Sequence, residues 1–280
     1  MPMSTTTISR VYRHTLPVRL FHWINAACFV MLLMSGLQIF NVHPRLYWGA
    51  TGYVGMPAVF EIAGDAASGG HDSWIQIGSL RIPTTGVLGA PTDVPSFGRI
   101  NYAFPGWMTL PSGTMSLGRG RGWHFLVFWI FVANFAAYAA YGLFTGRFRR
   151  LLLPSRSELR PRAVLRDLAD HLRFRVPAAH ALGTYNLLQK LSYLLVVAVL
   201  LPTQILSGMV MSNSALALFP WLLDIFGGRQ SARTIHFVAA ALLLLFLLVH
   251  VFQAFVAGIV NEMRSMITGY FHLPEKPNHE

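Results

Sequence analysis

Charged residues are scarce in this sequence, and four long stretches contain none. Only 12% of the 280 residues are Asp, Glu, Lys or Arg, while 54% are hydrophobic; a soluble domain usually carries about 25% charged residues. The uncharged stretches cover residues 20–40, 122–146, 191–211 and 234–261. Each exceeds the roughly 18–20 residues that cross ~30 Å of hydrocarbon. This composition excludes an ordinary soluble domain and predicts four membrane-spanning helices.

Cysteine is almost absent, because Cys28 is the only one in the chain. The sequence therefore has neither a disulfide framework nor the CxxCH motif that attaches haem covalently.

The basic N-terminus leads into an apolar run that is too long for a cleaved signal peptide. We interpret this segment as an uncleaved membrane anchor.

Acidic residues are also few, with 11 Asp and Glu against 22 Lys and Arg. Region 147–175 holds nine Arg and three acids, whereas the longer segment 41–121 holds five Arg and four acids. Three more arginines precede the first uncharged run: Arg10, Arg13 and Arg19. Because basic residues gather in cytoplasmic segments, both termini are expected on the cytoplasmic side of the membrane that the chain crosses. Topology and lipid contact explain the basic run without nucleic acid.

The predicted fold is an all-α integral membrane four-helix bundle made of a single domain, residues 1–280. The spans are expected at about 18–40, 122–146, 187–211 and 233–260. A long periplasmic loop, 41–121, joins the first two spans, and a cytoplasmic loop, 147–186, joins the second and third. Within the long loop, the alternating stretch WIQIGSLRIPTTGVLG (74–89) predicts a short hairpin. The Pro of LPV (16–18) indicates a helix start.

Two short patterns recur along the chain. The first span ends SGLQIFN (35–41) and the third ends SGMVMSN (207–213). The second span opens RGWHF (121–125) and the fourth opens RTIHF (233–237). These repeats suggest that the chain consists of two related helical hairpins.

Four histidines in the apolar stretches are predicted to meet in pairs. Helix residues are about 100° apart, so the 14 positions between His236 and His250 bring both to one face, about 21 Å apart along the axis. His124 follows Arg121 by three residues, as His236 follows Arg233, so these two lie at one level. Measured along the helix axis from the predicted outer surface of the membrane, His22 and His250 differ in depth by about 3 Å. These two histidines are therefore also expected at about one level.

We call His22 with His250 the inner pair and His124 with His236 the outer pair. Facing neutral imidazoles are the axial ligands that an iron porphyrin takes. A zinc or copper site would need three or four ligands at one point. The alternative use of each histidine is helix packing or a proton path.

Arginines and glycines accompany the paired histidines. Arg19, Arg121 and Arg233 each precede one histidine by three residues, on the same helix face, where a guanidinium suits a haem propionate. Arginine at the end of a span is also ordinary membrane anchoring. Small residues at Gly36, Gly142 and Gly208 would let a flat ring approach the backbone.

The stretches LPVRLFHWINA (16–26) and TYNLLQKLSY (184–193), with the spaced histidine pair, carry a family resemblance. The chain resembles the di-haem cytochrome b subunits of respiratory oxidoreductases. These are the hydrogenase cytochrome b, formate dehydrogenase gamma and thiosulfate reductase cytochrome b group of the cytochrome b561 superfamily. The resemblance covers all four spans and implies two haem b groups, one on the inner and one on the outer pair.

The same resemblance implies a quinone site near the inner pair. In the formate dehydrogenase relatives a YNAGQK stretch helps to form the quinone pocket, and four residues here match it: Tyr185, Asn186, Gln189 and Lys190. The glycine of that motif is replaced by Leu188. From the residues alone, Asn186 and Gln189 either bind a quinone carbonyl or cap a helix.

The expected function is membrane electron transfer in a respiratory chain, between a periplasmic molybdopterin or iron–sulfur oxidoreductase subunit and quinone. Whether the chain is itself an enzyme stays open. One alternative is a self-sufficient quinone-linked oxidoreductase that acts on a small periplasmic oxidant or reductant such as superoxide. Another is a haem-free membrane anchor or transporter.

Overall fold

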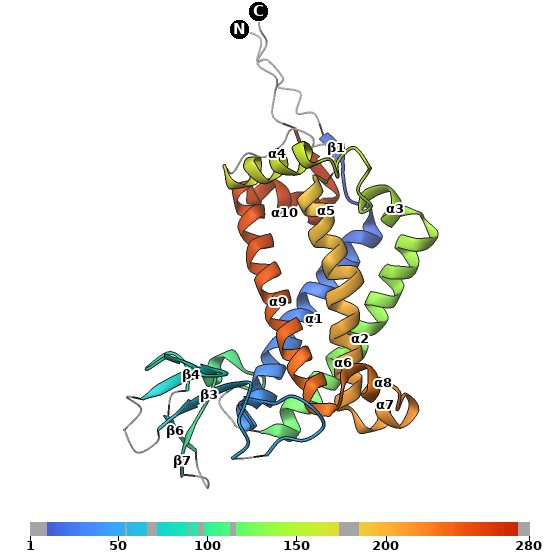
Figure 1. The fold of residues 1–280 in the computed structure, drawn as a ribbon. Coiled ribbons are helices and arrows are strands. Elements are labelled where there is room, and N and C mark those ends of the chain that lie inside the picture. Colours follow the sequence, from blue (N-terminus) through green and yellow to red (C-terminus); the bar gives the residue numbers. More distant parts are fainter. Residues whose placement is uncertain are drawn as a thin grey trace, which may run out of the picture. The chain divides into compact units, whose positions relative to one another are not determined.

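The structure, a computed structural model, describes residues 10–53, 55–65, 72–89, 91–94, 98–112, 116–173 and 185–273. Within these residues, four helices are long and apolar enough to cross a membrane: α1 (Leu16–Val42), α2 (Leu117–Phe144), the composite helix Leu187–Met211, and α9 (Arg229–Val256) (Figure 1). The predicted membrane fold with four helical spans is confirmed.

Local chemistry explains where the first two long helices begin. Pro17 lies in the first turn of α1, where its missing N–H removes no helical hydrogen bond. Helix α2 begins ahead of the uncharged stretch because Ser116 caps it: the Ser116 hydroxyl accepts from the Arg119 N–H at 3.3 Å.

The third long helix is composite. It consists of α5 (Leu187–Leu194), a π-helical stretch η3 (Leu195–Leu200) and α6 (Leu201–Met211). Pro202 has no N–H to donate, and in a regular α-helix its ring would clash with the carbonyl of Ala198. The wider π turns directly before Pro202 relieve this conflict.

The chain divides into two compact units. The first unit comprises Met1–Ile24, Asn134–Leu200 and Leu242–Glu280, and the second comprises Asn25–Ala133 and Leu201–Ala241. Each unit therefore contains a section of all four long helices. The inner histidine pair belongs to the first unit and the outer pair to the second.

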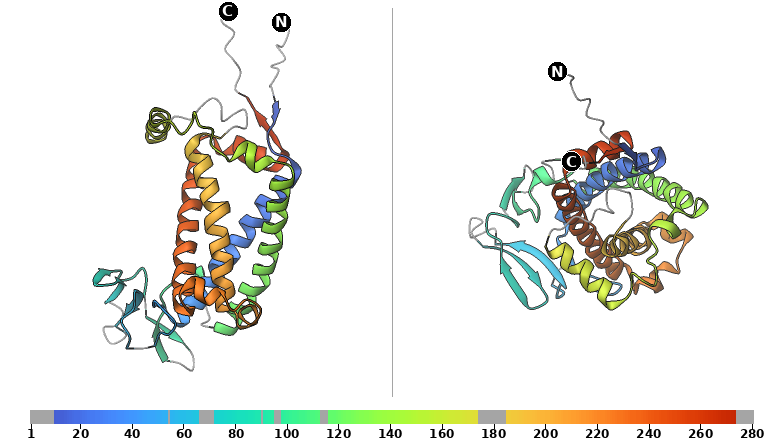
Figure 2. Two further views of the ribbon diagram at one scale, coloured as in Figure 1. Left: turned by 45° about the vertical axis from the view of Figure 1, so that its right-hand side comes forward. Right: turned by 90° about the horizontal axis from the view of Figure 1, so that it is seen from above.

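In the first unit, segments from the two ends of the chain lie side by side. Strand β1 (Arg10–Tyr12) pairs antiparallel with β8 (Tyr270–His272) (Figure 2). The Arg13 guanidinium is 3.0 Å from the Glu262 carboxylate of α10 (Ile259–Thr268), and both side chains are almost fully buried. The unit also contains the short helices α3 (Arg147–Leu151) and α4 (Pro161–Leu172).

The second unit carries the strands of the long loop. Strands β2 (Arg45–Leu46), β3 (Phe60–Gly64), β4 (Ser73–Ile77) and β5 (Leu80–Pro83) form an antiparallel sheet in that order. The predicted hairpin is confirmed, since Ile77 pairs with Leu80 across a turn at Gly78. A second hairpin joins β6 (Pro91–Val94) and β7 (Gly98–Asn101), and η1 (Gly106–Met108) follows.

The start of α9 is held by a close backbone contact in this second unit. The Gly49 carbonyl accepts from the N–H groups of Gln230 and Ser231, and the Ser231 hydroxyl accepts from the Gly49 N–H. A Cβ at Gly228 would lie 2.6 Å from the Gly49 oxygen, so only glycine fits there. Helices α7 (Asn213–Leu218) and α8 (Leu222–Phe226) lead into this junction.

Candidate functional site

The structure brings the two members of the inner pair together. His22 of α1 and His250 of α9 have ring centroids 6.3 Å apart. Phe246 stacks on the His250 ring at 5.8 Å, and the Trp23 ring meets His22 edge-on at 5.1 Å. The Nδ1 atom of His22 is buried and has no hydrogen-bond partner among the described residues. Aromatic rings thus hold this pair in place.

The outer pair has the same spacing but polar neighbours. The ring centroids of His124 on α2 and His236 on α9 are also 6.3 Å apart. The Ser35 hydroxyl lies 2.9 Å from His124 Nδ1, and the Ser207 hydroxyl lies 3.1 Å from His236 Nδ1. The amide nitrogen of Gln204 lies 2.9 Å from His236 Nε2.

Both pairs fit an iron with two imidazole ligands. A metal held about 2.0 Å from one nitrogen of each ring separates the two ring centroids by roughly 6 Å. The observed 6.3 Å in each pair agrees with that separation. At His236, iron on Nε2 would replace the hydrogen bond from Gln204.

The three arginines contact protein groups. Arg233 donates to the His43 carbonyl at 2.6 Å, and Arg19 donates to the carbonyl of Ile267. The Arg121 guanidinium lies 5.8 Å from the centre of the Phe125 ring. Each arginine belongs to the same unit as the histidine that it precedes. A role in binding propionates stays a prediction.

Two of the three glycines noted in the sequence lie against the outer pair. A Cβ at Gly36 would be 3.6 Å from Cε1 of His124, and one at Gly208 would be 3.2 Å from Cε1 of His236. At Gly142 a Cβ would lie 2.3 Å from the Phe148 ring, so that glycine makes room for Phe148.

The YNLLQK segment forms a helix cap. Asn186 Oδ1 accepts from the Gln189 N–H at 2.9 Å, and Gln189 Oε1 accepts from the Asn186 N–H at 3.3 Å, which is a capping box at the start of α5. Lys190 Nζ donates to the Glu158 carboxylate at 2.7 Å. Of the two uses foreseen for Asn186 and Gln189, the structure shows capping. Thr184, the first residue of the quoted stretch, lies outside the described residues.

Aromatic contacts join this segment to the inner pair within the first unit. Burial raises the pKa of Tyr185, whose ring lies 5.1 Å from that of Tyr193. Tyr193 lies 6.2 Å from Phe246, the residue stacked on His250. Tyr185 and His250 are thus the two ends of one series of contacting rings.

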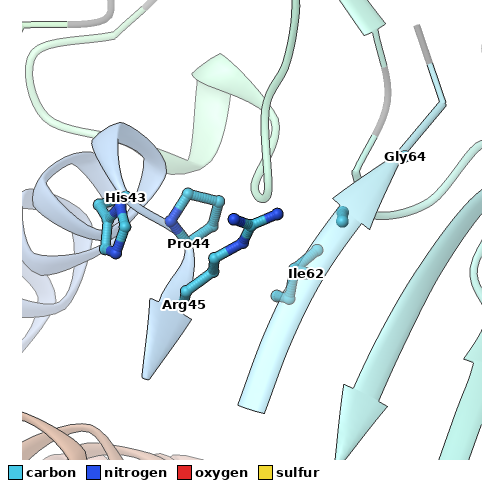
Figure 3. A pocket seen from close by; sticks show the side chains of 6 residues that line it. His43, Pro44, Arg45, Ile62 and Gly64 are labelled. Carbon is cyan, nitrogen blue, oxygen red and sulfur yellow. The ribbon is translucent and has the colours of Figure 1, made fainter. Parts of the chain in front are cut away.

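A small open cavity of about 220 Å³ lies in the second unit (Figure 3). It is lined by His43, Pro44, Arg45, Ile62, Ala63 and Gly64. Arg45 pairs with Glu61 at 3.1 Å. Burial, Arg233 and Arg45 together lower the pKa of His43, which favours its neutral form. None of the four paired histidines lines this cavity, and the sequence did not predict it.

Acidification is expected to destabilise the first unit through His14. Burial, followed by the charge of Arg13, lowers the pKa of His14 to about 4 from the ordinary value of about 6.5. Glu262 opposes the shift, and Arg147 and His22 add to it. Because the unfolded chain binds the proton more tightly, stability is full above the ordinary pKa and falls as pH drops towards 4.

Between pH 7 and pH 5 the loss amounts to about 2 kcal/mol. Hydrogen exchange of the β1 and α10 amides against pH measures it, with His14→Gln as the variant that removes the titrating group. The expectation is wrong if wild type and variant show the same pH dependence.

Four apolar helices and two facing histidine pairs define a class: integral membrane proteins with paired imidazoles suited to haem. The chain belongs to the prokaryotic cytochrome b561 family, whose model matches residues 13–269. The resemblance seen in the sequence is thereby confirmed. Family membership makes this chain a membrane electron-transfer protein that binds b-type haem.

A curated relative supports the same assignment. The chain is 34% identical over 154 residues to the putative protein-methionine-sulfoxide reductase subunit YedZ1 of Azospira oryzae. The match covers 55% of this chain and 73% of that protein. No solved structure matches the chain.

Proposed function

We propose that this chain is a di-haem cytochrome b that passes electrons between a periplasmic oxidoreductase and the quinone pool. The observation that carries the proposal is the repeated geometry: each unit holds one pair of imidazoles with centroids 6.3 Å apart. Two pairs of this kind offer axial ligands for two haems.

In this proposal His22 and His250 hold the inner haem, and His124 and His236 hold the outer one. Haem supplies reversible one-electron oxidation and reduction. The protein binds and orients the groups and keeps water from them. Burial of Ser35, Ser207 and Gln38, each at most 1% exposed, shows how closely the second unit is packed around its histidine pair.

The partner is proposed to dock on the sheet of the second unit. Phe237, next to His236, stacks on Phe40 at 4.7 Å and lies 5.2 Å from Phe60 of strand β3, so the sheet is packed directly on the helix of the outer pair. Ile77, Leu80 and Ile82 of the β4–β5 hairpin are 49%, 58% and 42% exposed, which leaves apolar surface for a partner. The name of the Azospira relative, a putative reductase subunit, supports an oxidoreductase subunit as the partner, which we propose to be of the molybdopterin or iron–sulfur type.

Quinone is proposed to bind beside the inner pair, near Tyr185, Asn186, Gln189 and Lys190. The ring series from Tyr185 to His250 supports this location. Since Asn186 and Gln189 cap α5, we assign the donor roles to the Tyr185 hydroxyl and the Lys190 ammonium. Pairing of β1 with β8 supports placement of these two segments at one membrane face, and the excess of arginine near the N-terminus and in region 147–175 leads us to propose that this is the cytoplasmic face of a bacterial inner membrane.

Tyr185→Phe is expected to slow electron exchange with a quinol analogue about tenfold while leaving both haems bound, because one hydrogen bond to the quinone oxygen is lost. Stopped-flow reduction of the purified protein measures the rate. Tyr270→Phe, at an exposed tyrosine of β8, is the matched control and keeps the wild-type rate. Equal rates in both variants would remove Tyr185 from the quinone site.

The visible spectrum and haem content of the protein purified in detergent test the proposal as a whole. Two haems per chain with a b-type reduced spectrum, and reduction by quinol, are the expected results. A haem-free protein would favour the anchor or transporter. Rapid oxidation by superoxide with no partner present would favour the self-sufficient oxidoreductase.

A further inference from the structure

The outer pair lies against two copies of the same dipeptide. Ser35-Gly36 of α1 contacts His124 of α2, and Ser207-Gly208 of α6 contacts His236 of α9. These are the SG and RxxHF patterns that recur in the sequence. Each Ser-Gly pair therefore contacts the histidine of the span that follows it, so the repeat in the sequence corresponds to one contact that occurs twice in the structure.

The hydroxyl of each serine has one possible role towards its histidine. Ser35 Oγ donates to the Met31 carbonyl at 2.7 Å, and Ser207 Oγ donates to the Thr203 carbonyl at 2.6 Å. A hydroxyl has a single proton, so once it is donated the oxygen can only accept. His124 and His236 then carry their proton on Nδ1 and donate it to the serine oxygen and to a helix carbonyl beside it, that of Leu32 for His124 and that of Gln204 for His236.

The tautomer that results leaves Nε2 with its lone pair. At His236 the Gln204 amide nitrogen lies 2.9 Å from Nε2, and because an amide nitrogen can only donate, this contact agrees with a lone pair on Nε2. The glycines of the two dipeptides differ in the room that they leave: a Cβ at Gly208 would lie 3.2 Å from Cε1 of His236 and press on the ring, whereas one at Gly36 would lie 3.6 Å from Cε1 of His124, an ordinary contact.

The inner pair lacks this arrangement among the described residues. His22 Nδ1 is buried with no hydrogen-bond partner, and His250 is flanked by the Phe246 ring. The same imidazole type is thus held in two ways within one chain: by hydroxyls at the outer pair and by aromatic rings at the inner pair.

We propose that Ser35 and Ser207 are positioning residues of the outer haem that fix the Nδ1–H tautomer of its ligands and lower its reduction potential relative to the inner haem. This inference rests on the proposed haem ligands. A ligand imidazole that donates its other N–H becomes a stronger electron donor, which favours ferric over ferrous iron. Because each hydroxyl is already polarised towards a helix carbonyl, its oxygen is a better acceptor.

Ser35→Ala and Ser207→Ala are the variants that test the inference. Each should shift the ratio of reduced to oxidised outer haem about tenfold towards the reduced form at a fixed potential, which is about 59 mV for one electron. The inner haem should keep its potential. A spectroscopic redox titration of the intact chain, still carrying both haems, gives both values.

Two further variants separate the hydrogen bond from general packing. Ser35→Thr and Ser207→Thr keep a hydroxyl that can reach the same helix carbonyl, so the potential should return to the wild-type value. Ser192→Ala is the control, because Ser192 donates to the Leu188 carbonyl at 2.5 Å in the same manner but belongs to the first unit. It should change neither potential.

The glycines provide a matched pair with different expected outcomes. Gly208→Ala places a methyl 3.2 Å from His236 Cε1, which is too close, whereas Gly36→Ala places one 3.6 Å from His124 Cε1, an ordinary contact. Both gain the same helix propensity. Gly208→Ala should raise the outer potential and speed haem loss to apomyoglobin; Gly36→Ala should do neither.

The results separate failure of this inference from failure of the proposed function. The proposed ligands are wrong if the wild-type protein binds no haem. They are also wrong if the outer haem persists after His124 or His236 is replaced. Haem bound through those histidines, with unchanged potentials in both serine-to-alanine variants, overturns the role of the serines. Equal shifts in the alanine and threonine variants would also overturn it.

Discussion

Replacing His236 with alanine is expected to halve the haem content of the purified protein and to remove the proposed outer haem alone. That haem would lose one of its two proposed axial ligands, whereas His22 and His250 belong to the other unit and are untouched. We expect His124→Ala to remove the same haem, and His22→Ala or His250→Ala to remove the inner one. A pyridine haemochrome assay gives the content, and a redox titration shows which of the two transitions is missing.

His272→Ala is the matched control for these four variants. His272 lies in β8, outside the spans, where Arg264 contacts its Nδ1 at 3.0 Å. This variant should keep both haems. If any one of the four ligand replacements retains full haem content and both redox transitions, that histidine is not a ligand.

Replacing Arg13 with methionine lowers the free energy of unfolding in detergent by about 3–5 kcal/mol. The Arg13 and Glu262 side chains are only 4% and 14% exposed, and Arg13 Nη1 is 3.0 Å from both carboxylate oxygens. Removal of the cation takes the charge of Arg13 away from a carboxylate that is largely buried. Chemical denaturation monitored by circular dichroism measures the loss.

Two comparisons identify charge burial as the cause. The double variant Arg13→Met/Glu262→Met should recover most of the lost stability, because neither charge then remains buried. Arg45→Met breaks a more exposed pair with Glu61, in which the arginine side chain is 32% exposed, and should cost at most about 1 kcal/mol. A double variant as unstable as Arg13→Met would contradict this account.

The membrane helices and the meeting of histidines in pairs could be predicted because both depend on regular helix geometry. An uncharged run of sufficient length has few alternatives to a membrane helix. Helix rise and rotation then bring His22 level with His250, and His124 level with His236. These predictions needed no knowledge of loops or of side-chain packing.

Other features depend on contacts that a linear pattern does not contain. The use of Asn186 and Gln189 in a cap became clear only from their mutual hydrogen bonds, since a short polar side chain serves equally for a ligand or a helix end. Most strands of the long loop went unpredicted because their partners are set by tertiary packing, as in the cluster of Phe40, Phe60 and Phe237. The serines of the outer pair were visible as a repeat, but their contact with histidine was not.

Low-temperature electron paramagnetic resonance of the oxidised, detergent-purified protein tests the central claim most directly. Paired imidazole ligands at both sites predict two low-spin ferric signals, one of which disappears in His236→Ala and the other in His250→Ala. A high-spin ferric signal in the wild-type protein, or no ferric haem signal at all, would contradict the account.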